Sequence, residues 1–213
     1  MQLTSINVIK NLCKKLDIRP SKKLGQNFLI NKNILDKIIK AGELSKRDNV
    51  LEIGPGFGVL TQELLKYTKN LTIVEKDKRL VEFLGKEIKG LKIINDDILK
   101  ISNFQDTISK QIPNSKFQIQ NYKIISNLPY QITSPVLWKF LHEEKNKPEM
   151  MVLMVQKEVA ERIISKPGKM SILSVMCQFY ADIKLVSWVN RKNFYPEPDV
   201  DSAIIKFKIQ DSR

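Results

Sequence analysis

The feature that most constrains the fold is an apolar run that ends in a glycine-rich turn and continues as a helix. The run "NVLEIG" (49–54) leads into the turn Gly54-Pro55-Gly56-Phe57-Gly58, and "VLTQELLKYT" (59–68) then has the 3.6-residue period of a helix. A strand pattern (70–77), a helix pattern (78–90) and a third strand pattern (91–97) follow. This alternation predicts a parallel sheet with right-handed crossovers.

The rest of the chain extends the same pattern. Further strands are expected at 121–127, 150–155, 182–189 and 201–210, with helices between them and two more helices at 5–16 and 34–42. Asn31 or Asn33 is the expected cap of the second of these helices, and Ser134 is the expected N-cap of the helix after residue 127, with Pro135 at its first position. The period of two in "DSAIIKFKIQ" predicts an antiparallel hairpin at one edge. We therefore expect an α/β, Rossmann-like fold with a seven-stranded, mostly parallel sheet.

The charge balance indicates a polyanionic partner. The chain has 36 Lys and Arg against 23 Asp and Glu, a net charge of +13. A surface of that sign favours RNA, DNA or an anionic membrane. The alternative is a solvated basic surface in a lysine-rich proteome, and charge alone leaves it open.

Cysteine and histidine usage narrows the chemistry. Cys13 and Cys177 form no C-x-x-C motif, and His142 is the single histidine, at the end of a helix pattern. Zinc sites, disulfide frameworks and Ser/His/Asp hydrolysis are therefore disfavoured. No apolar run reaches the ~18–20 residues of a membrane span. We expect a cytoplasmic protein without a metal and without a membrane partner, and a monomer.

The glycine turn and two acidic residues predict a nucleoside site. Ligands of open α/β sheets bind outside the carboxyl ends of the strands, where glycines let them approach the backbone. The spacing is G-x-G-x-G and not the G-x-G-x-x-G of dinucleotide binders. Glu75 follows Gly54 by 21 residues, close to the ~20-residue offset of an acid that binds ribose hydroxyls, and Asp97 ends the third strand. Each acid alone could be a solvated turn residue, and their combination favours the site.

The tetrad Asn127-Leu128-Pro129-Tyr130 ends the fourth strand beside the same crevice. An aromatic amine is a poor nucleophile, and two acceptors, the Asn127 side-chain oxygen and the Leu128 carbonyl, can take its two N–H bonds. Pro129 fixes φ and removes a donor, and Tyr130 offers a face on which a base can stack. The alternative is a proline turn with the tyrosine in the core. Phe194 is a candidate second face for a flipped base, or an edge-loop aromatic that covers the sheet.

With these segments in view, the chain resembles the ribosomal RNA adenine dimethyltransferases of the KsgA type. The resemblance runs from about residue 3 to residue 209. It rests on seven blocks in the family's order: "LGQNFL" (24–29), "VLEIGPGFGVLT" (50–61), "VEKD" (74–77), "NDDIL" (95–99), "SNLPY" (126–130), "VQKEVAERI" (155–163) and "FYPEPDVDSAI" (194–204).

The resemblance implies an enzyme that uses S-adenosyl-L-methionine to dimethylate adenine N6 in small-subunit rRNA, within an immature 30S particle. It implies cofactor-binding roles for Gln26, Asn27, Leu29, Gly54, Gly56, Glu75, Lys76, Asp97, Ile98 and Asn127. It implies target-adenine roles for Asn127, Leu128, Tyr130 and Phe194. The basic loops suggest phosphate contacts by Lys22, Lys23, Lys157, Arg162, Arg191 and Lys192.

Two departures from the family's pattern concern the RNA side. The stretch "KPGKMSILSV" is shorter than usual, and the chain ends at Arg213, where the family continues into a small helical domain. We therefore expect residues 1–213 to be one catalytic domain, with the N-terminal helix and basic loop (1–30) included and the C-terminal domain absent or truncated.

Three alternatives remain open. One is an erythromycin-resistance-type methyltransferase of 23S rRNA, which tends toward another glycine turn and isoleucine in place of Leu128. Another is a ribosome-assembly factor that binds RNA without catalysis, which the retained Asn127, Tyr130 and Glu75 disfavour. A DNA adenine methyltransferase would have a D-P-P-Y-like tetrad, which this sequence lacks.

Overall fold

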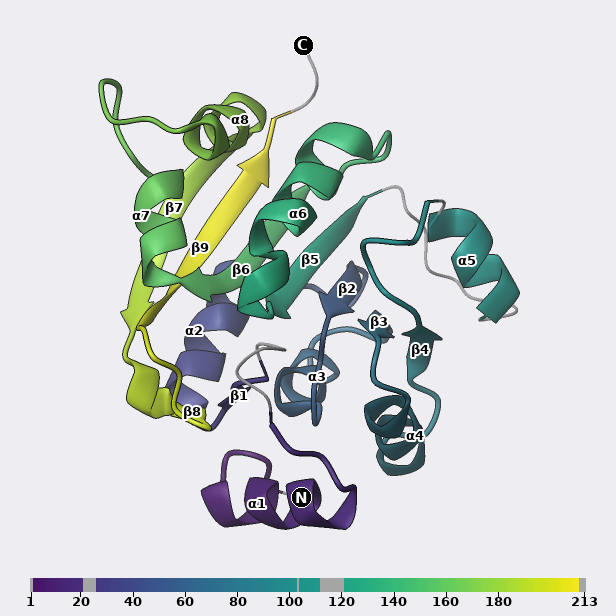
Figure 1. The fold of residues 1–213 in the computed structure, drawn as a ribbon. Coiled ribbons are helices and arrows are strands. Elements are labelled where there is room, and N and C mark those ends of the chain that lie inside the picture. Colours follow the sequence, from purple (N-terminus) through teal and green to yellow (C-terminus); the bar gives the residue numbers. More distant parts are fainter. Residues whose placement is uncertain (1, 21–25, 103, 112–120, 211–213) are drawn as a thin grey trace.

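The computed structural model describes residues 2–20, 26–102, 104–111 and 121–210, so the predicted phosphate contacts Lys22 and Lys23 lie outside it. Its main sheet has seven strands in the order β4-β3-β2-β5-β6-β9-β7 (Figure 1). Their bounds are β2 (Asn49–Ile53), β3 (Asn70–Glu75), β4 (Lys92–Asn95), β5 (Tyr122–Asn127), β6 (Met150–Gln156), β7 (Ala181–Val189) and β9 (Ser202–Ile209). The strands β4, β3, β2, β5 and β6 are parallel, and β9 is antiparallel to both β6 and β7. The predicted α/β fold class is confirmed.

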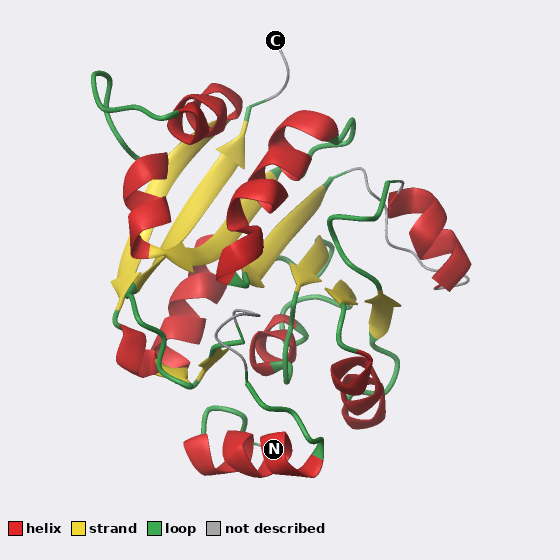
Figure 2. Ribbon diagram, viewed as in Figure 1, coloured by secondary structure: helices red, strands yellow, loops and turns green. Residues whose placement is uncertain are grey.

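Helices cover both faces of the sheet. They are α1 (Ile6–Lys15), α2 (Lys32–Gly42), α3 (Val59–Leu64), α4 (Lys78–Glu87), α5 (Phe104–Gln111), α6 (Thr133–Trp138), α7 (Lys157–Ile163) and α8 (Ile172–Tyr180). One core cluster joins the sheet to α5, α6, α7 and α8, and a second joins the other face to α1, α2, α3 and α4. The ribbon view shows the helices around the sheet (Figure 2). The continuous apolar runs in β5 and β6 follow from this, because both of their faces are buried.

The strand order predicts a ligand crevice between β2 and β5. The chain runs from β2 outward to β3 and β4 and then returns to place β5 on the other side of β2. The connections after β2 and β5 therefore diverge to opposite sides, which opens a crevice at the carboxyl ends of these two strands. The glycine turn follows β2, and the Asn127 tetrad ends β5.

The predicted antiparallel hairpin is formed by β7 and β9, but the last strand of the chain is not the one at the edge. β9, the last strand, inserts between β6 and β7, so the earlier strand β7 forms the edge. Ile204, Ile205 and Phe207 are fully buried because β9 is paired on both sides and covered on both faces.

The helix after β5 begins earlier than predicted. A 3-10 turn, η2 (Tyr130–Ile132), continues directly into α6, whose N-cap is Ile132. The prediction of Ser134 as N-cap is therefore wrong, because the main chain is already helical there and the Pro129 carbonyl accepts from the Ile132 N–H at 3.1 Å. Pro135 still lies in the first turn, where a missing N–H costs no helical bond. In α2, by contrast, Asn31 is the cap, and its side chain accepts from the Asn33 N–H at 2.9 Å.

A second, two-stranded sheet joins distant parts of the chain. β1 (Phe28–Leu29) pairs antiparallel with β8 (Phe194–Tyr195). Asn31 Nδ2 also donates to Asn193 Oδ1 at 2.7 Å. The segment before α2 is thereby tied to the aromatic loop that precedes β9.

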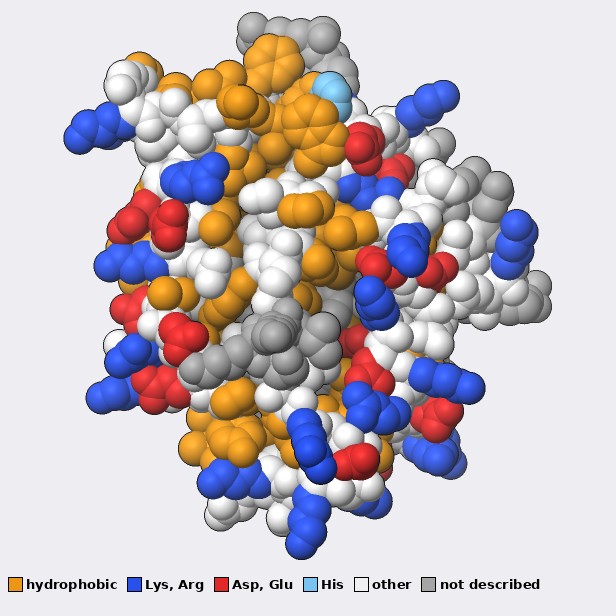
Figure 3. All heavy atoms as spheres, viewed as in Figure 1, with side chains coloured by type: hydrophobic (Ala, Val, Ile, Leu, Met, Phe, Trp, Pro, Cys, Tyr) orange, Lys and Arg blue, Asp and Glu red, His pale blue; other side chains and the backbone are white. Residues whose placement is uncertain are grey.

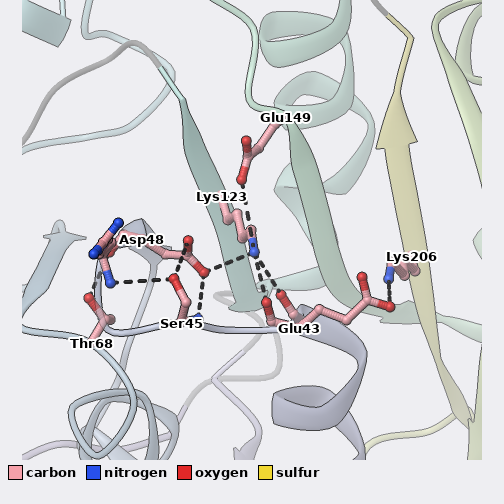
Figure 4. Close-up of polar contacts among 9 residues, drawn as sticks. Glu43, Ser45, Asp48, Thr68, Lys123, Glu149 and Lys206 are labelled. Carbon is pink, nitrogen blue, oxygen red and sulfur yellow. Dashed lines mark hydrogen bonds and ion pairs between the residues drawn. The ribbon is translucent and has the colours of Figure 1, made fainter.

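A polar cluster lies at the opposite end of the sheet from the glycine turn (Figure 4). The buried Lys123 Nζ donates to Asp48 Oδ2 and to the Glu43 carbonyl, both at 2.9 Å, and to the Gly42 carbonyl at 3.3 Å. Glu43 in turn pairs with Lys206 Nζ at 2.7 Å. The cluster fastens the end of α2 to β5 and β9.

Within the described residues, no helix is long and apolar enough to cross a membrane.

Candidate active site

The glycine turn packs closely against two other segments of the site. Gly54 and Gly56 have φ of +64° and +60°, a region that favours glycine. A Cβ on Gly54 would lie 3.2 Å from Pro129 Cδ, and one on Gly56 would lie 3.0 Å from Phe28 Cε1. The turn can therefore contact both the Asn127 tetrad and β1 only because it lacks side chains here.

A cavity of about 580 Å³ lies at these strand ends. Its size is within the usual range for a small-molecule or cofactor site. It brings together residues that the sequence predicted for one site, namely Gln26, Asn27, Leu29, Gly54, Gly56, Glu75, Lys76, Asp97, Ile98 and Asn127. Of the residues predicted to contact the target adenine, Leu128, Tyr130 and Phe194 do not line it.

Glu75, the last residue of β3, is held by the backbone. Its two oxygens accept from the Asp77 N–H at 2.9 Å and the Gly56 N–H at 3.4 Å. Burial raises the pKa of this carboxyl above its ordinary value, and the backbone bonds oppose the shift. Glu75 is therefore a rigid acceptor on the cavity wall.

Asp97 lies in the turn after β4, at the same end of the sheet. Lys76 Nζ contacts its Oδ2 at 2.9 Å, and the Leu99 N–H donates to its Oδ1 at 3.1 Å. Partial burial acts to raise the pKa of Asp97, but the hydrogen bonds from Lys76 and Leu99 and the charges of Lys76 and Lys100 together outweigh it, so the pKa lies below its ordinary value. Asp97 stays ionised and can accept from an amine.

Asn27 adds a buried acceptor to the cavity wall. Its side chain is 8% exposed, and its Oδ1 has no hydrogen-bond partner within the part of the chain that the structure describes. Buried polar atoms are almost always paired. The Asn27 carbonyl accepts from Asn127 Nδ2 at 3.3 Å, so the amide of Asn127 is oriented with its nitrogen toward β1.

The three remaining predicted residues lie around this cavity. The Leu128 side chain is 1% exposed, and its N–H donates to the Met154 carbonyl at 3.3 Å. The Tyr130 ring is half-buried, and its hydroxyl lies 2.7 Å from Ser202 Oγ. Phe194 is 3% exposed in the β1–β8 pair. A stacking role for Phe194 therefore requires the loop that carries it to move, and it stays a prediction.

A buried acid of the cavity, Glu52, was missed in the sequence. Glu52, the fourth residue of β2, is 1% exposed and lines the cavity, and its Oε2 accepts from Thr61 Oγ1 at 2.7 Å. Burial raises the pKa of Glu52 to about 8, although the Thr61 bond acts in the opposite direction. The signal that could have identified it was an acid inside an otherwise apolar strand.

Two of the four described basic residues, Lys157 and Arg191, lie near the start of β9. Lys157 Nζ is 5.7 Å from the Trp188 ring centroid, and Arg162 and Lys192 are exposed. Arg191 Nε pairs with Glu197 at 2.9 Å. The backbone N–H groups of Lys157 and Arg191 both donate to Asp201, at 2.9 Å each. The starts of two segments, α7 and the 3-10 turn Arg191–Asn193, thus meet at Asp201, next to Ser202.

In the parallel part of the sheet, the glycine turn follows β2, and acids lie at or just after the ends of β3 and β4. This arrangement is typical of a Rossmann-like protein of the methyltransferase type. The family described as Ribosomal RNA adenine dimethylase matches residues 7–213. The chain belongs to this family.

Individual relatives and solved structures agree with that assignment. The Ribosomal RNA small subunit methyltransferase A of Dehalococcoides mccartyi is 44% identical over 203 residues, which are 94% of this chain and 66% of the relative. A dimethyladenosine transferase from Plasmodium falciparum is 33% identical with a TM-score of 0.71, over 85% of this chain and 63% of that one. The 23S rRNA methyltransferase ErmE is 28% identical with a TM-score of 0.72, over 87% of this chain and 71% of that one. The chain thus spans about two thirds of the length of the curated relative.

Proposed function

We propose that this protein transfers methyl groups from S-adenosyl-L-methionine to the N6 amine of adenines in small-subunit ribosomal RNA, and that each of two adjacent adenines is methylated twice. The observation that carries the proposal is the position of Asn127. It ends β5 and lines the same cavity as Glu75 and Asp97, so an amine acceptor and a nucleoside site share one cavity. The name of the curated relative supports the choice of RNA.

The residues of the cavity fit the proposed cofactor. S-adenosylmethionine presents donors and positive charge: ribose hydroxyls, the adenine amine, an ammonium and a sulfonium. The cavity wall presents acceptors, namely the carboxylates of Glu75 and Asp97 and the Oδ1 of Asn27, which has no partner among the described residues. The glycine turn admits the ligand close to the backbone. When bound, the cofactor supplies a methyl group on a sulfonium sulfur, and this sulfur leaves readily as a neutral thioether when the methyl group is transferred.

The chain's own contribution to catalysis is positioning and the acceptance of N–H bonds. The Asn127 side-chain oxygen and the Leu128 carbonyl accept from the two N–H groups of the target amine, which favours a lone pair directed at the methyl group. Pro129, with a φ of −55°, fixes the backbone immediately after these two acceptors. Preorganised acceptors and alignment are sufficient sources of rate enhancement for such a transfer.

The substrate must reach the cavity as an unstacked base. We infer that Tyr130 and Phe194 contact this base and that Lys157, Arg162, Arg191 and Lys192 bind neighbouring phosphates. The proposed partner is an immature 30S particle in the cytoplasm, and the protein is proposed to act as a monomer without a metal.

A second candidate is methylation of 23S rRNA. The likeness to ErmE, with a TM-score of 0.72, favours it at the level of the fold. Leu128 and the turn Gly54-Pro55-Gly56-Phe57-Gly58 favour the small-subunit substrate.

The deciding experiment offers both subunits to the protein. Immature 30S particles and 50S particles, each lacking the modification, are incubated with cofactor labelled on the methyl group, and the labelled base is mapped. We expect label on N6 of adjacent adenines in 16S-type RNA. Label only in 23S-type RNA supports the second candidate, and no label in either RNA supports a non-catalytic assembly role.

A further inference from the structure

A hydrogen bond links the Asn127 tetrad to the last strand of the sheet. Tyr130 Oη and Ser202 Oγ are 2.7 Å apart, although the two residues are 72 positions apart in the chain. Tyr130 begins the η2 turn, and Ser202 is the first residue of β9.

The Ser202 end of this bond is rigid. Ser202 is fully buried and pairs with Gln156 of β6 on one side and Val189 of β7 on the other. The residue before it, Asp201, accepts from the backbone of Lys157 through its carbonyl and from that of Arg191 through its side chain, both at 2.9 Å. The Ser202 hydroxyl therefore lies at a point fixed by three strands and two loops.

The Tyr130 end depends on this anchor. Asn127, Pro129, Gln131 and Ile132 line the cofactor cavity, whereas Tyr130 does not. Its side chain is directed toward β9, where the hydroxyl is held at the far end of the ring. Burial raises the pKa of Tyr130 above its ordinary value, so the phenol is neutral and keeps its proton for the bond. A ring fixed at both ends loses the freedom to turn about its side-chain torsions.

We propose that Ser202 is a positioning residue for methyl transfer: it holds the Tyr130 ring in the orientation in which the ring face meets the target base. The inference rests on the proposed function, which assigns Tyr130 to the target adenine. Ser202 itself touches neither base nor cofactor. It aligns the base indirectly, and misalignment by a fraction of the reacting distance lowers the rate of transfer.

Three variants test the bond by turnover on immature 30S particles and by calorimetry of cofactor binding. Ser202→Ala and Tyr130→Phe each remove one hydroxyl, and we expect each to lower kcat roughly three- to tenfold, the range of one ordinary hydrogen bond. The dissociation constant of the cofactor should stay within about twofold, because neither residue lines the cavity. The double variant should be no slower than the slower single variant, because both changes remove the same bond.

Rescue and a matched control separate positioning from stability. Ser202→Thr restores the hydroxyl on a residue that favours strands, and we expect it to recover most of the reduced kcat. Ser174→Ala removes another fully buried serine hydroxyl, which accepts from the Ser171 N–H in the capping box of α8 and does not line the cavity. It should lower the melting temperature without lowering kcat.

The outcomes distinguish this inference from the proposed function. Wild-type turnover in Ser202→Ala, or a double variant whose loss is the product of the single losses, overturns the positioning role while methylation by the wild type stands. If the wild-type protein methylates neither RNA, the proposed function fails and the role of Ser202 fails with it. If Ser202→Ala does not fold, Tyr130→Phe decides alone: an unchanged kcat in that variant overturns the inference.

Discussion

At the scale of single residues, buried carboxyl groups set the chemistry of the cavity. Glu52 and Glu75 both line it and are both almost fully buried, and burial raises the pKa of each. Asp97 is closer to solvent, and Lys76 lowers its pKa. The cavity thus offers carboxyls whose charge depends differently on pH, which makes Glu52 the residue to test.

Glu52→Gln should change how stability depends on pH. The pKa of Glu52 is 4.5 in an ordinary environment and about 8 in the folded protein. Between these values the unfolded chain loses a proton that the folded protein retains, so the wild-type free energy of unfolding decreases as pH rises, by up to about 1.4 kcal/mol per pH unit for this group. The contribution is constant below the lower value and above the upper one.

The measurement is urea denaturation of the cofactor-free protein from pH 5 to pH 8. We expect the free energy of unfolding of Glu52→Gln to decrease less steeply with pH than that of the wild type. Glu82→Gln, at an exposed position of α4, is the control and should follow the wild type. Parallel curves for wild type and Glu52→Gln would show that Glu52 is ionised in the folded protein at pH 5.

Asn127→Ala separates catalysis from cofactor binding. The substitution removes the side-chain acceptor of the proposed amine site and the 3.3 Å bond to the Asn27 carbonyl. Removal of one preorganised group of this kind typically costs a factor of about 10²–10³ in kcat. We expect such a loss on immature 30S particles, together with a cofactor dissociation constant raised by less than about tenfold.

The control for this variant is Asn146→Ala, in an exposed loop away from the cavity, which should retain wild-type turnover. Loss of cofactor binding in Asn127→Ala with unchanged turnover at saturating cofactor would assign Asn127 to the cofactor alone.

At the scale of elements, the two ends of the sheet differ in what they do. The carboxyl ends carry the cavity, whereas the opposite end carries the polar cluster around Lys123 (Figure 4). Lys123 satisfies the carbonyls of Gly42 and Glu43 at the end of α2, which have no partner within the helix. A lysine in a buried strand is therefore a structural connection and not a second site.

Lys123→Met should destabilise the fold without changing the site. The variant removes the Lys123 partner from two helix-end carbonyls and from the Asp48 carboxylate, which keeps only its bonds to Ser45. We expect a cost of about 2–3 kcal/mol, between the values for one charged hydrogen bond and a fully buried pair. Urea denaturation measures the loss, and Lys184→Met on the exposed side of β7 is the control with little change. A Lys123→Met variant as stable as the wild type would contradict this assignment.

At the scale of the whole molecule, an apolar patch and a group of basic residues lie over different elements. A hydrophobic patch lies over α8 and the end of α6, formed by Ile172, Val175, Phe179 and Trp138 (Figure 3). The basic residues next to Ser202 lie near the start of β9, where α7 and the Phe194 loop meet. A net charge of +13 makes RNA affinity a property of the whole surface, and these residues add a local component near the tetrad.

The salt dependence of RNA binding should report this local component. Arg191→Ala combined with Lys192→Ala should weaken binding to immature 30S particles. It should also make the negative slope of log K against log salt concentration shallower by about 2, one unit for each phosphate that is no longer neutralised. Filter binding between about 50 and 300 mM salt measures the slope. This range includes the concentration of about 0.1 M at which the Debye length is ~10 Å. Lys86→Ala combined with Lys89→Ala, at the end of α4, removes the same charge elsewhere. Equal slopes in the two double variants would exclude a dedicated phosphate site at Arg191 and Lys192.

The sequence by itself determined the elements and the edge at which they place the site. The glycine turn, Glu75, Asp97 and Asn127 each lie at or just after the end of a strand, and parallel strands end at the same edge, so local patterns were sufficient to predict one cavity for them. The prediction of a helix cap at Asn31 or Asn33 also rested on a local pattern. Asn31 is the cap, and its hydrogen-bond partner is only two residues away.

Only the tertiary structure decided the contacts between segments far apart in the chain. The insertion of β9 between β6 and β7, the pairing of β1 with β8 and the burial of Phe194 all depend on which surfaces remain uncovered once the sheet has formed. The pKa of Glu52 depends on the burial of its strand, and the Tyr130–Ser202 bond on the position of β9. Periodicity reports the local conformation of a segment, whereas these features follow from the packing of surfaces that no local pattern encodes.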